Sequence, residues 1–155
     1  MTTTLASRRL SLRRVTLPKV ATARRPAEPE SLETIPAGPI VKWAGGKTKL
    51  LPEIERRMPK SYRRYFEPFF GGGALFFHLQ PKVAILGDWN RDLVNMYRCV
   101  AWNVEAVIRR LHQYRSDHGK DYYYATREAW NDTERTWGNV DRAATFIYLN
   151  KTCFN

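Results

Sequence analysis

The spacing of apolar residues along the chain predicts helices and short strands from about Ile40 onward. Apolar side chains recur at helical spacing in residues 48–58, 74–80, 90–115, 121–137 and 139–150. Pro52 falls in the first of these helices, where a proline is tolerated only in the first turn. Residues 62–70 form an aromatic run of strand length, and residues 82–89 form a short continuous apolar run. The second run is typical of a strand that is buried on both faces.

The predicted order is strand, glycine turn, helix, strand and long helix, which begins an α/β sheet with right-handed crossovers. Two strands cannot complete such a sheet, because a two-stranded parallel sheet leaves its edges and one apolar face without partners. Either the fold is unusually small or the chain is the front part of a larger protein.

Residues 1–39 are predicted to be a disordered basic tail, because they are rich in Ser, Thr, Arg and Pro. Their prolines, at positions 18, 26, 29, 36 and 39, forbid a long helix. The first 25 residues carry seven basic side chains and no acidic one, which is the composition of an organelle transit peptide. A solvated tail and a misassigned start codon fit the same composition. We prefer those interpretations, because composition alone gives many false matches.

The charge balance of the chain indicates a polyanionic partner. Lys and Arg number 26 against 15 Asp and Glu, so the formal net charge is +11. Residues 1–40 contribute seven basic and three acidic side chains, a net charge of +4, and the remaining +7 belongs to the part that is predicted to fold. Nucleic acid is the commonest partner of such a surface.

Composition also excludes several classes of protein. No stretch approaches 18 consecutive apolar residues, so the sequence predicts no membrane-spanning helix and no membrane partner. Cys99 and Cys153 are the only cysteines, too few for a disulfide framework or a zinc site built from cysteines. We therefore expect no metal and a reducing, cytoplasmic environment.

The Gly-Gly-Lys-Thr of residues 45–48 invites a comparison with phosphate-binding loops of nucleotide hydrolases. That motif requires a further glycine at position 41, where the chain has Val41, so the spacing argues against it. The two glycines still allow a sharp turn and a close approach to a ligand. Trp43 could stack on a flat ring and Lys47 could pair with a carboxylate; a core tryptophan beside a solvated lysine explains the same residues equally well.

The stretch "FEPFFGGGAL" ends a predicted strand and opens a helix with three glycines, where backbone N–H groups are free to bind an anionic or polar group. Its spacing is not the dinucleotide-binding fingerprint, because the third glycine of that fingerprint is absent. The carboxylate of Glu67 can pair with a cationic ligand group. Asp88 follows the next strand and is positioned to accept hydrogen bonds from ribose hydroxyls. Asp88 could instead cap the next helix, but together with the glycine turn and Glu67 a nucleoside ligand is the better interpretation.

The stretches "KWAGGK", "FEPFFGGGAL", "ILGDWNRDL" and "FIYLNKTCFN" together resemble the Dam family of adenine-specific DNA methyltransferases, in that family's order and spacing. The resemblance covers about residues 40–155. It implies an S-adenosylmethionine cofactor bound in a Rossmann-like sheet, double-stranded DNA as the partner, a monomer, and a prokaryotic or phage context. The implied fold class is α/β: an incomplete Rossmann-like S-adenosylmethionine-dependent methyltransferase fold with a mainly helical C-terminal part.

The resemblance also implies roles for individual positions. Residues that match the cofactor-binding positions of the family are Trp43, Lys47, Glu67, Gly71, Gly73 and Asp88. In the family, the turn that contains the matching glycines surrounds the methionine moiety and the matching acid binds the ribose. Residues that match DNA-contacting positions are Lys42, Phe154 and Asn155. Phe154 stands where such enzymes often have Tyr, which keeps ring stacking and removes a hydroxyl contact.

The resemblance divides the chain into a tail (1–39), a cofactor-binding α/β part (40–115) and a helical segment that starts the target-recognition region (116–155). Family members carry a catalytic Asp-Pro-Pro-Tyr further along the chain, and neither it nor an Asn-Pro-Pro variant occurs in this sequence. The sequence therefore offers no catalytic residue. We interpret the chain as a fragment of a site-specific DNA adenine methyltransferase. The alternatives are a non-catalytic basic DNA-binding module derived from that fold and, weakened by Val41, a nucleoside-triphosphate hydrolase.

We expect the purified 155-residue chain to transfer no methyl group to DNA. The exocyclic amino group of adenine is a poor nucleophile, and the groups that would accept its hydrogens and stack on the flipped base belong to the absent motif. Incubation with tritiated S-adenosylmethionine and adenine-containing duplex DNA measures this directly. Incorporation of label above that of heat-denatured chain would contradict the expectation.

Overall fold

A computed structural model describes residues 37–153 of the chain. Residues 1–36 lie outside the described residues, so the predictions of a disordered tail and of a transit-peptide-like segment apply almost entirely to residues that are not described. The predicted DNA-contacting residues Phe154 and Asn155 also lie outside them. The elements are a 3₁₀ helix η1 (Lys47–Leu50), α1 (Leu51–Arg57), β1 (Tyr65–Glu67), α2 (Ala74–Leu79), β2 (Ala84–Leu86), α3 (Arg91–Trp102), α4 (Val104–Asp117), α5 (Lys120–Asn131) and α6 (Asn139–Thr152). Within residues 37–153, none of these helices has the length and apolar character needed to cross a bilayer.

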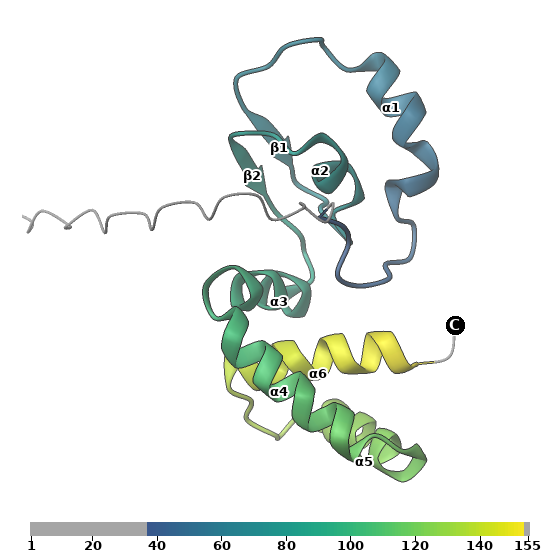
Figure 1. The fold of residues 1–155 in the computed structure, drawn as a ribbon, viewed down its shortest axis with the longest axis vertical. Coiled ribbons are helices and arrows are strands. Elements are labelled where there is room, and N and C mark those ends of the chain that lie inside the picture. The colour runs from purple at the N-terminus through teal and green to yellow at the C-terminus, as the bar shows by residue number, and fades with distance from the viewer. Residues whose placement is uncertain (1–36, 154–155) are drawn as a thin grey trace, which may run out of the picture. The chain divides into compact units, whose positions relative to one another are not determined.

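The two strands form a small parallel sheet in which Phe66 pairs with Ile85 (Figure 1). Between them the chain passes through the three glycines and α2, so the predicted order of strand, glycine turn, helix and strand is confirmed. Pro52 lies in the first turn of α1, as predicted. A mixed helix and strand structure with a small parallel sheet is compatible with the expected α/β methyltransferase fold.

The expectation that the strand within residues 82–89 is buried on both faces is wrong for the described part of the protein. Ile85 is 55% exposed and Leu86 is 39% exposed. The cause is the number of strands, since a strand is buried on both faces only where further strands and helices surround it. The described sheet has just two strands.

The helix predicted over residues 90–115 is two helices, α3 and α4, which meet at Asn103. The backbone of Asn103 leaves the helical region (φ −140°, ψ 34°), and its carbonyl oxygen accepts hydrogen bonds from the N–H groups of Ala106 and Val107. The apolar spacing continues through this break, so periodicity did not reveal it. The helix predicted over 121–137 also ends early, at Asn131.

The core of the described part lies among α3, α4 and α6, and Figure 1 shows α6 beside both other helices. α3 contributes Leu93 and Met96, and α6 contributes Ala143 and Ala144, all completely buried. The side chain of Asn90 starts α3 by accepting a hydrogen bond from the Leu93 N–H, as a helix cap does.

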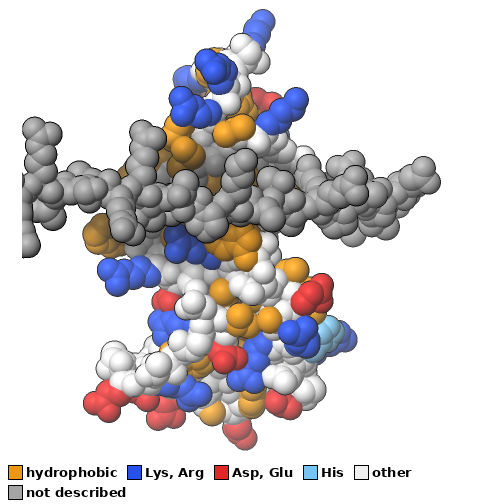
Figure 2. Space-filling view, turned by 90° about the vertical axis from the view of Figure 1, so that its left-hand side faces the viewer, with side chains coloured by type: hydrophobic (Ala, Val, Ile, Leu, Met, Phe, Trp, Pro, Cys, Tyr) orange, Lys and Arg blue, Asp and Glu red, His pale blue; other side chains and the backbone are white. Residues whose placement is uncertain are grey.

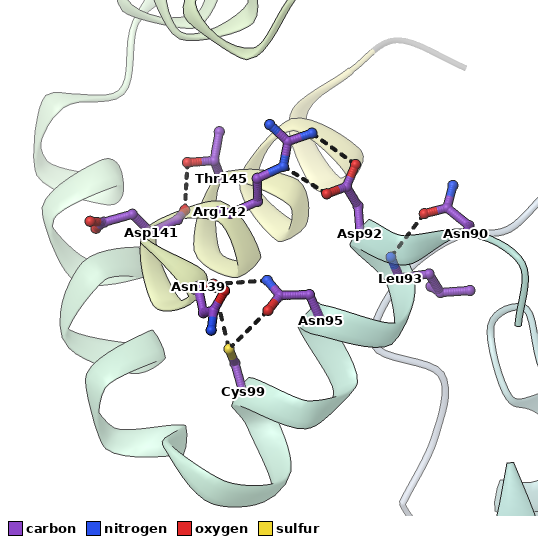
Figure 3. Close-up of polar contacts among 9 residues, drawn as sticks. All are labelled: Asn90, Asp92, Leu93, Asn95, Cys99, Asn139, Asp141, Arg142 and Thr145. Atoms are coloured by element: carbon purple, nitrogen blue, oxygen red, sulfur yellow. Dashed lines mark hydrogen bonds and ion pairs between the residues drawn. The ribbon is translucent and has the colours of Figure 1, made fainter. Parts of the chain in front are cut away.

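Polar contacts fix the register of α3 against α6 (Figure 3). The Asp92 carboxylate accepts two hydrogen bonds from the guanidinium of Arg142, with Oδ1–Nε 2.7 Å and Oδ2–Nη2 2.9 Å. Asn95 donates from Nδ2 to the carbonyl oxygen of Asn139. Paired bonds between a planar guanidinium and a carboxylate allow one orientation only, so the two helices are held in one alignment.

Substitution Leu93→Ala should lower the free energy of unfolding by about 2–5 kcal/mol, because it removes a fully buried side chain and leaves a cavity at the α3–α6 contact. Val104→Ala is the control, since Val104 is 42% exposed in the first turn of α4. Urea denaturation followed by circular dichroism measures both changes. Equal losses in the two variants would show that the α3–α6 contact is not the stabilising core.

Candidate functional site

A cavity of about 590 Å³ within residues 37–153 lies where three segments meet. The first is the loop of residues 39–48, the second is the glycine turn of residues 69–74, and the third is Asp88 at the end of β2. Lys151 of α6 completes the wall. A volume in this range suits a ligand of the size of a drug or a nucleoside.

The loop is attached to α6 by Asn150. Its side chain accepts a hydrogen bond from the N–H of Lys42 (2.8 Å) and donates one to the Lys42 carbonyl oxygen (2.8 Å), so it pairs with both backbone groups of Lys42. Val41 is buried in the core, and the ring of Trp43 lies 6.2 Å from that of Phe146 in α6. Helix α6 therefore sets the position of Lys42 and Trp43 at the cavity.

The glycine turn depends on the absence of side chains. Gly71 and Gly73 have positive φ angles of 56° and 76°, which side-chain-bearing residues rarely adopt. A Cβ on Gly71 would lie 2.9 Å from Cδ1 of Trp43, and one on Gly73 would lie 2.5 Å from Cζ of Phe70. The turn can therefore approach Trp43 closely and expose backbone to the cavity only because these positions are glycine.

Asp88 connects the turn to α3. Its Oδ2 accepts a hydrogen bond from the Gly71 N–H (2.8 Å), and its Oδ1 accepts one from the Asn90 N–H (2.9 Å). The residue that caps α3 is Asn90, so the interpretation of Asp88 as the helix cap is wrong. An ionised carboxylate has about four acceptor sites, and two remain for a ligand.

Glu67 is 5% exposed and both of its oxygens have partners. Oε1 pairs with Nζ of Lys47 at 2.9 Å, and Oε2 accepts a hydrogen bond from the Tyr65 hydroxyl at 2.7 Å. Burial, and then the hydrogen bond to Glu67 and its negative charge, raise the pKa of Tyr65 well above its usual value. Tyr65 therefore stays protonated at neutral pH and remains a donor to Glu67.

Lys47 lies between Glu67 and the cavity. Its ammonium also donates to the carbonyl oxygen of Phe69 at 2.6 Å. An ammonium has three N–H donors, so one is left for a ligand. The interpretation of Lys47 as an ordinary solvated lysine is wrong, because its ammonium pairs with a buried carboxylate.

Tyr97 of α3 supports the turn from behind. Its hydroxyl donates to the Gly72 carbonyl oxygen at 2.8 Å, and its ring lies edge-on to Phe70 at 4.8 Å. Burial, and secondarily the negative charge of Glu67, raise the pKa of Tyr97 to about 12. The hydroxyl is therefore a permanent donor over the physiological pH range.

The structure brings together most of the residues that the sequence singled out. Those that line the cavity are Lys42, Trp43, Lys47, Gly71, Gly73 and Asp88. Glu67 does not line it and lies behind Lys47. Among residues 37–153, no three His, Cys, Asp or Glu side chains gather in a group that could hold a metal ion.

Sequence reasoning missed several residues of this region, among them Lys151, which lines the cavity. Asn150 and Tyr97 act through contacts with segments far away in the chain, which no local pattern reveals. Trp89 follows Asp88 and is 95% exposed. A large aromatic residue directly after the strand-end acid was a usable signal, because an exposed ring there can stack on a flat ligand.

Basic side chains gather outside the cavity as well. Figure 2 shows Lys and Arg side chains grouped in the upper part of the view, with mixed charges lower down. The exposed basic residues of α1 and the segment that follows it are Arg56, Arg57, Lys60, Arg63 and Arg64. Arg56 and Arg57 pair with Glu53, which leaves this segment with a clear positive excess.

Comparisons with known proteins agree on one family. The profile of the D12 class N6 adenine-specific DNA methyltransferases matches residues 43–155. A type II methyltransferase of Lactococcus lactis subsp. cremoris is 42% identical over 118 residues, which cover 76% of this chain and 42% of that protein. A type II methyltransferase of Methanocaldococcus jannaschii is 38% identical over 133 residues, covering 76% of this chain and 46% of that protein. The DNA adenine methylase of Haemophilus influenzae is 37% identical over 120 residues, covering 76% and 41%. The chain thus spans less than half the length of these relatives.

Three glycine substitutions should differ in their effect on the free energy of unfolding. Gly73→Ala should lower the free energy of unfolding through two effects. The left-handed backbone should cost roughly 1–2 kcal/mol. The clash of the new Cβ with Phe70 should cost about 1–3 kcal/mol more. Gly45→Ala should show the backbone effect alone, because its φ is +70° and a Cβ there meets nothing within 4 Å.

Gly119→Ala is the control for both, since its backbone is extended (φ −172°) and the space around it is open. Chemical denaturation of the three variants measures the differences. Equal stability of the Gly45 and Gly73 variants would contradict the close packing of the turn against Phe70.

Proposed function

The chain belongs to the D12 class of N6 adenine-specific DNA methyltransferases, and on that premise we propose that it is the cofactor-binding part of an enzyme that methylates adenine in double-stranded DNA. The observation that carries this proposal is the cavity between the loop of residues 39–48, the glycine turn and Asp88. We propose S-adenosylmethionine as its ligand. When bound, this cofactor supplies an activated methyl group on a positively charged sulfur.

The residues present fit such a ligand at both ends. Because its glycines carry no side chains, the turn packs directly against Trp43 and Phe70 and borders the cavity with backbone, which a ligand can approach closely. The Asp88 carboxylate keeps acceptor capacity for the two ribose hydroxyls while it holds Gly71 and Asn90. Trp43 lines the cavity, and its ring provides a flat apolar surface for the ligand.

Lys47 and Glu67 are proposed to bind the methionine end by exchanging partners. A buried carboxylate requires a positive partner, which Lys47 supplies in this structure. The α-amino group of the ligand would take the place of Lys47 on Glu67, and Lys47 would turn to the ligand carboxylate. Both protein charges stay paired throughout, so binding leaves no buried charge uncompensated.

Lys42 of the loop is proposed to contact DNA. Lys42 is exposed, and Asn150 holds its backbone on α6. Phe154 and Asn155 follow α6 and are proposed as further contacts, together with the positive charge that remains outside the tail. We propose that the protein acts as a monomer, with residues 116–155 beginning the target-recognition region.

The two strands are proposed to be part of a larger Rossmann-like sheet, with residues 40–115 as the cofactor-binding part. The Asp-Pro-Pro-Tyr motif of the family is absent from this sequence, so the residues of this chain bind and orient, and none abstracts a proton or stacks on a flipped base. The exposed basic residues of α1 and of the segment that follows it favour a second candidate function, a basic DNA-binding module without catalysis. Salt-sensitive DNA binding without any affinity for S-adenosylmethionine would distinguish that candidate.

Substitution Asp88→Ala should weaken S-adenosylmethionine binding by about 10- to 150-fold, because hydrogen bonds to a charged acceptor contribute about 1.5–3 kcal/mol. Isothermal titration calorimetry on the 155-residue chain measures the change. Asp121→Ala is the matched control, since Asp121 is exposed in the first turn of α5.

A ligand that lacks the hydroxyls separates a ribose contact from a structural effect, since Asp88 also holds the glycine turn. With a 2′,3′-dideoxyribose analogue of the cofactor, the penalty of Asp88→Ala should disappear. An unchanged affinity for S-adenosylmethionine, or an equal penalty with both ligands, would rule out Asp88 as the ribose ligand. Undetectable binding by the unsubstituted chain would reject the cofactor proposal itself.

A further inference from the structure

A second cavity, of about 530 Å³, lies along one side of α3. Four of its lining residues follow one another at intervals of four, three and four positions, which is the spacing of a single helix face: Arg91, Asn95, Arg98 and Trp102. We call these four residues the α3 stripe. It is about 16 Å long, because a helix rises about 1.5 Å per residue. The cavity shares only Asp88 with the proposed cofactor cavity.

The α3 stripe carries positive charge that no acidic group neutralises. Arg91 and Arg98 are both exposed, and neither forms an ion pair with an acidic group of residues 37–153. The carboxylate among the lining residues is that of Asp88, whose two oxygens already accept hydrogen bonds from Gly71 and Asn90. The planar guanidinium group binds phosphate through paired hydrogen bonds, so phosphate is the anion that this stripe fits.

Trp102 adds a second chemical feature at the end of the stripe. It is the last residue of α3 and is 74% exposed. A flat indole ring in water beside guanidinium groups is the combination with which proteins bind single strands, because the ring stacks on a base while the basic side chains bind phosphates. In a duplex the bases stack on one another, so a duplex offers the ring no free base face.

Amide side chains border the same cavity. Figure 3 shows Asn95 and Cys99 of α3 beside Asn139 at the start of α6. Asn95 Nδ2 donates to the Asn139 carbonyl oxygen at 2.9 Å, and the Cys99 thiol donates to that oxygen at 3.4 Å, so this wall is held in place. Asn103 is an exposed residue of the lining. Its amide can donate and accept hydrogen bonds, as the edge of a base or a phosphate requires.

We propose that the α3 stripe binds an unpaired segment of a nucleic acid strand, with phosphates on Arg91 and Arg98 and a base stacked on Trp102. Charge complementarity supports the phosphate contacts, and the exposed ring supports an unpaired base. An acidic peptide would satisfy the two arginines but would leave the ring without a flat partner. The inference needs neither the cofactor nor a catalytic step, so it goes beyond the proposed function.

Fluorescence anisotropy of a labelled ten-nucleotide oligothymidylate measures binding to the 155-residue chain. Trp102→Ala should weaken binding by about 5- to 150-fold, as loss of one stacked base does. Arg98→Gln should weaken binding and lower the slope of log affinity against log salt by about 0.7, because one phosphate contact is lost.

Tyr124→Ala and Arg109→Gln are the matched controls. Tyr124 is a 53% exposed aromatic residue of α5, and Arg109 is an exposed arginine of α4. Neither lines the cavity, so both variants should bind as the unsubstituted chain does. Any binding by the basic tail is the same in every variant. Trp102→Phe keeps a flat ring and should recover most of the affinity that Trp102→Ala loses.

Circular dichroism establishes that each variant folds, and the Arg98 comparison tests the site if Trp102→Ala does not. Absence of binding, or equal affinities of the α3 stripe variants and their controls, would overturn the proposal. So would equal affinity for a duplex of the same length, or equally strong competition by polyglutamate, since either would show that only charge is recognised. An oligouridylate of equal length distinguishes RNA from DNA as the preferred strand, and stronger binding of either that depends on Trp102 supports the site. Calorimetry with S-adenosylmethionine tests the proposed function separately, so either can fail without the other.

Discussion

The carboxylate of Asp88 is the connection on which the arrangement of the site depends. It accepts hydrogen bonds from the N–H groups of Gly71 and Asn90, and so joins the glycine turn after β1 to the start of α3. Charge-assisted bonds of this kind are stronger than those between neutral groups. Because α3 packs on α6, and α6 holds Lys42 through Asn150, the orientation of the loop that closes the cavity follows from the same set of contacts.

A second constraint is the buried charge of Glu67. A carboxylate that is 5% exposed requires full hydrogen bonding, and Lys47 and Tyr65 provide it. The raised pKa of Tyr65 keeps its hydroxyl a donor. The site thus contains a pair of opposite charges next to a cavity, in which the carboxylate is buried and the ammonium is partly exposed. Such a pair suits a ligand that carries both an amino group and a carboxylate, since each protein charge can exchange one partner for another.

Much of the fold could be predicted from the sequence, because helices and strands impose short-range periodicities. The order of elements, the position of Pro52 and the glycine turn were correct for this reason. The division between α3 and α4 was not predictable, because Leu93, Val100, Val104 and Leu111 keep helical spacing through the break at Asn103. The burial of residues 82–89 was predicted wrongly. An apolar run indicates that a strand favours burial, but burial also requires neighbouring strands and helices, and the described sheet has only two strands.

By itself, the sequence determined which chemical groups are available: the glycines that permit positive φ, the acids at two strand ends and the excess of basic residues. Only the tertiary structure decided which of these groups meet. Lys42 and Asn150 are 108 positions apart, and their two hydrogen bonds follow no local pattern. The pairing of Lys47 with Glu67 likewise required the loop and β1 to come together. Side-chain chemistry and short-range spacing can be read directly from the sequence. Contacts between distant segments depend on how α3, α4 and α6 pack around a common core.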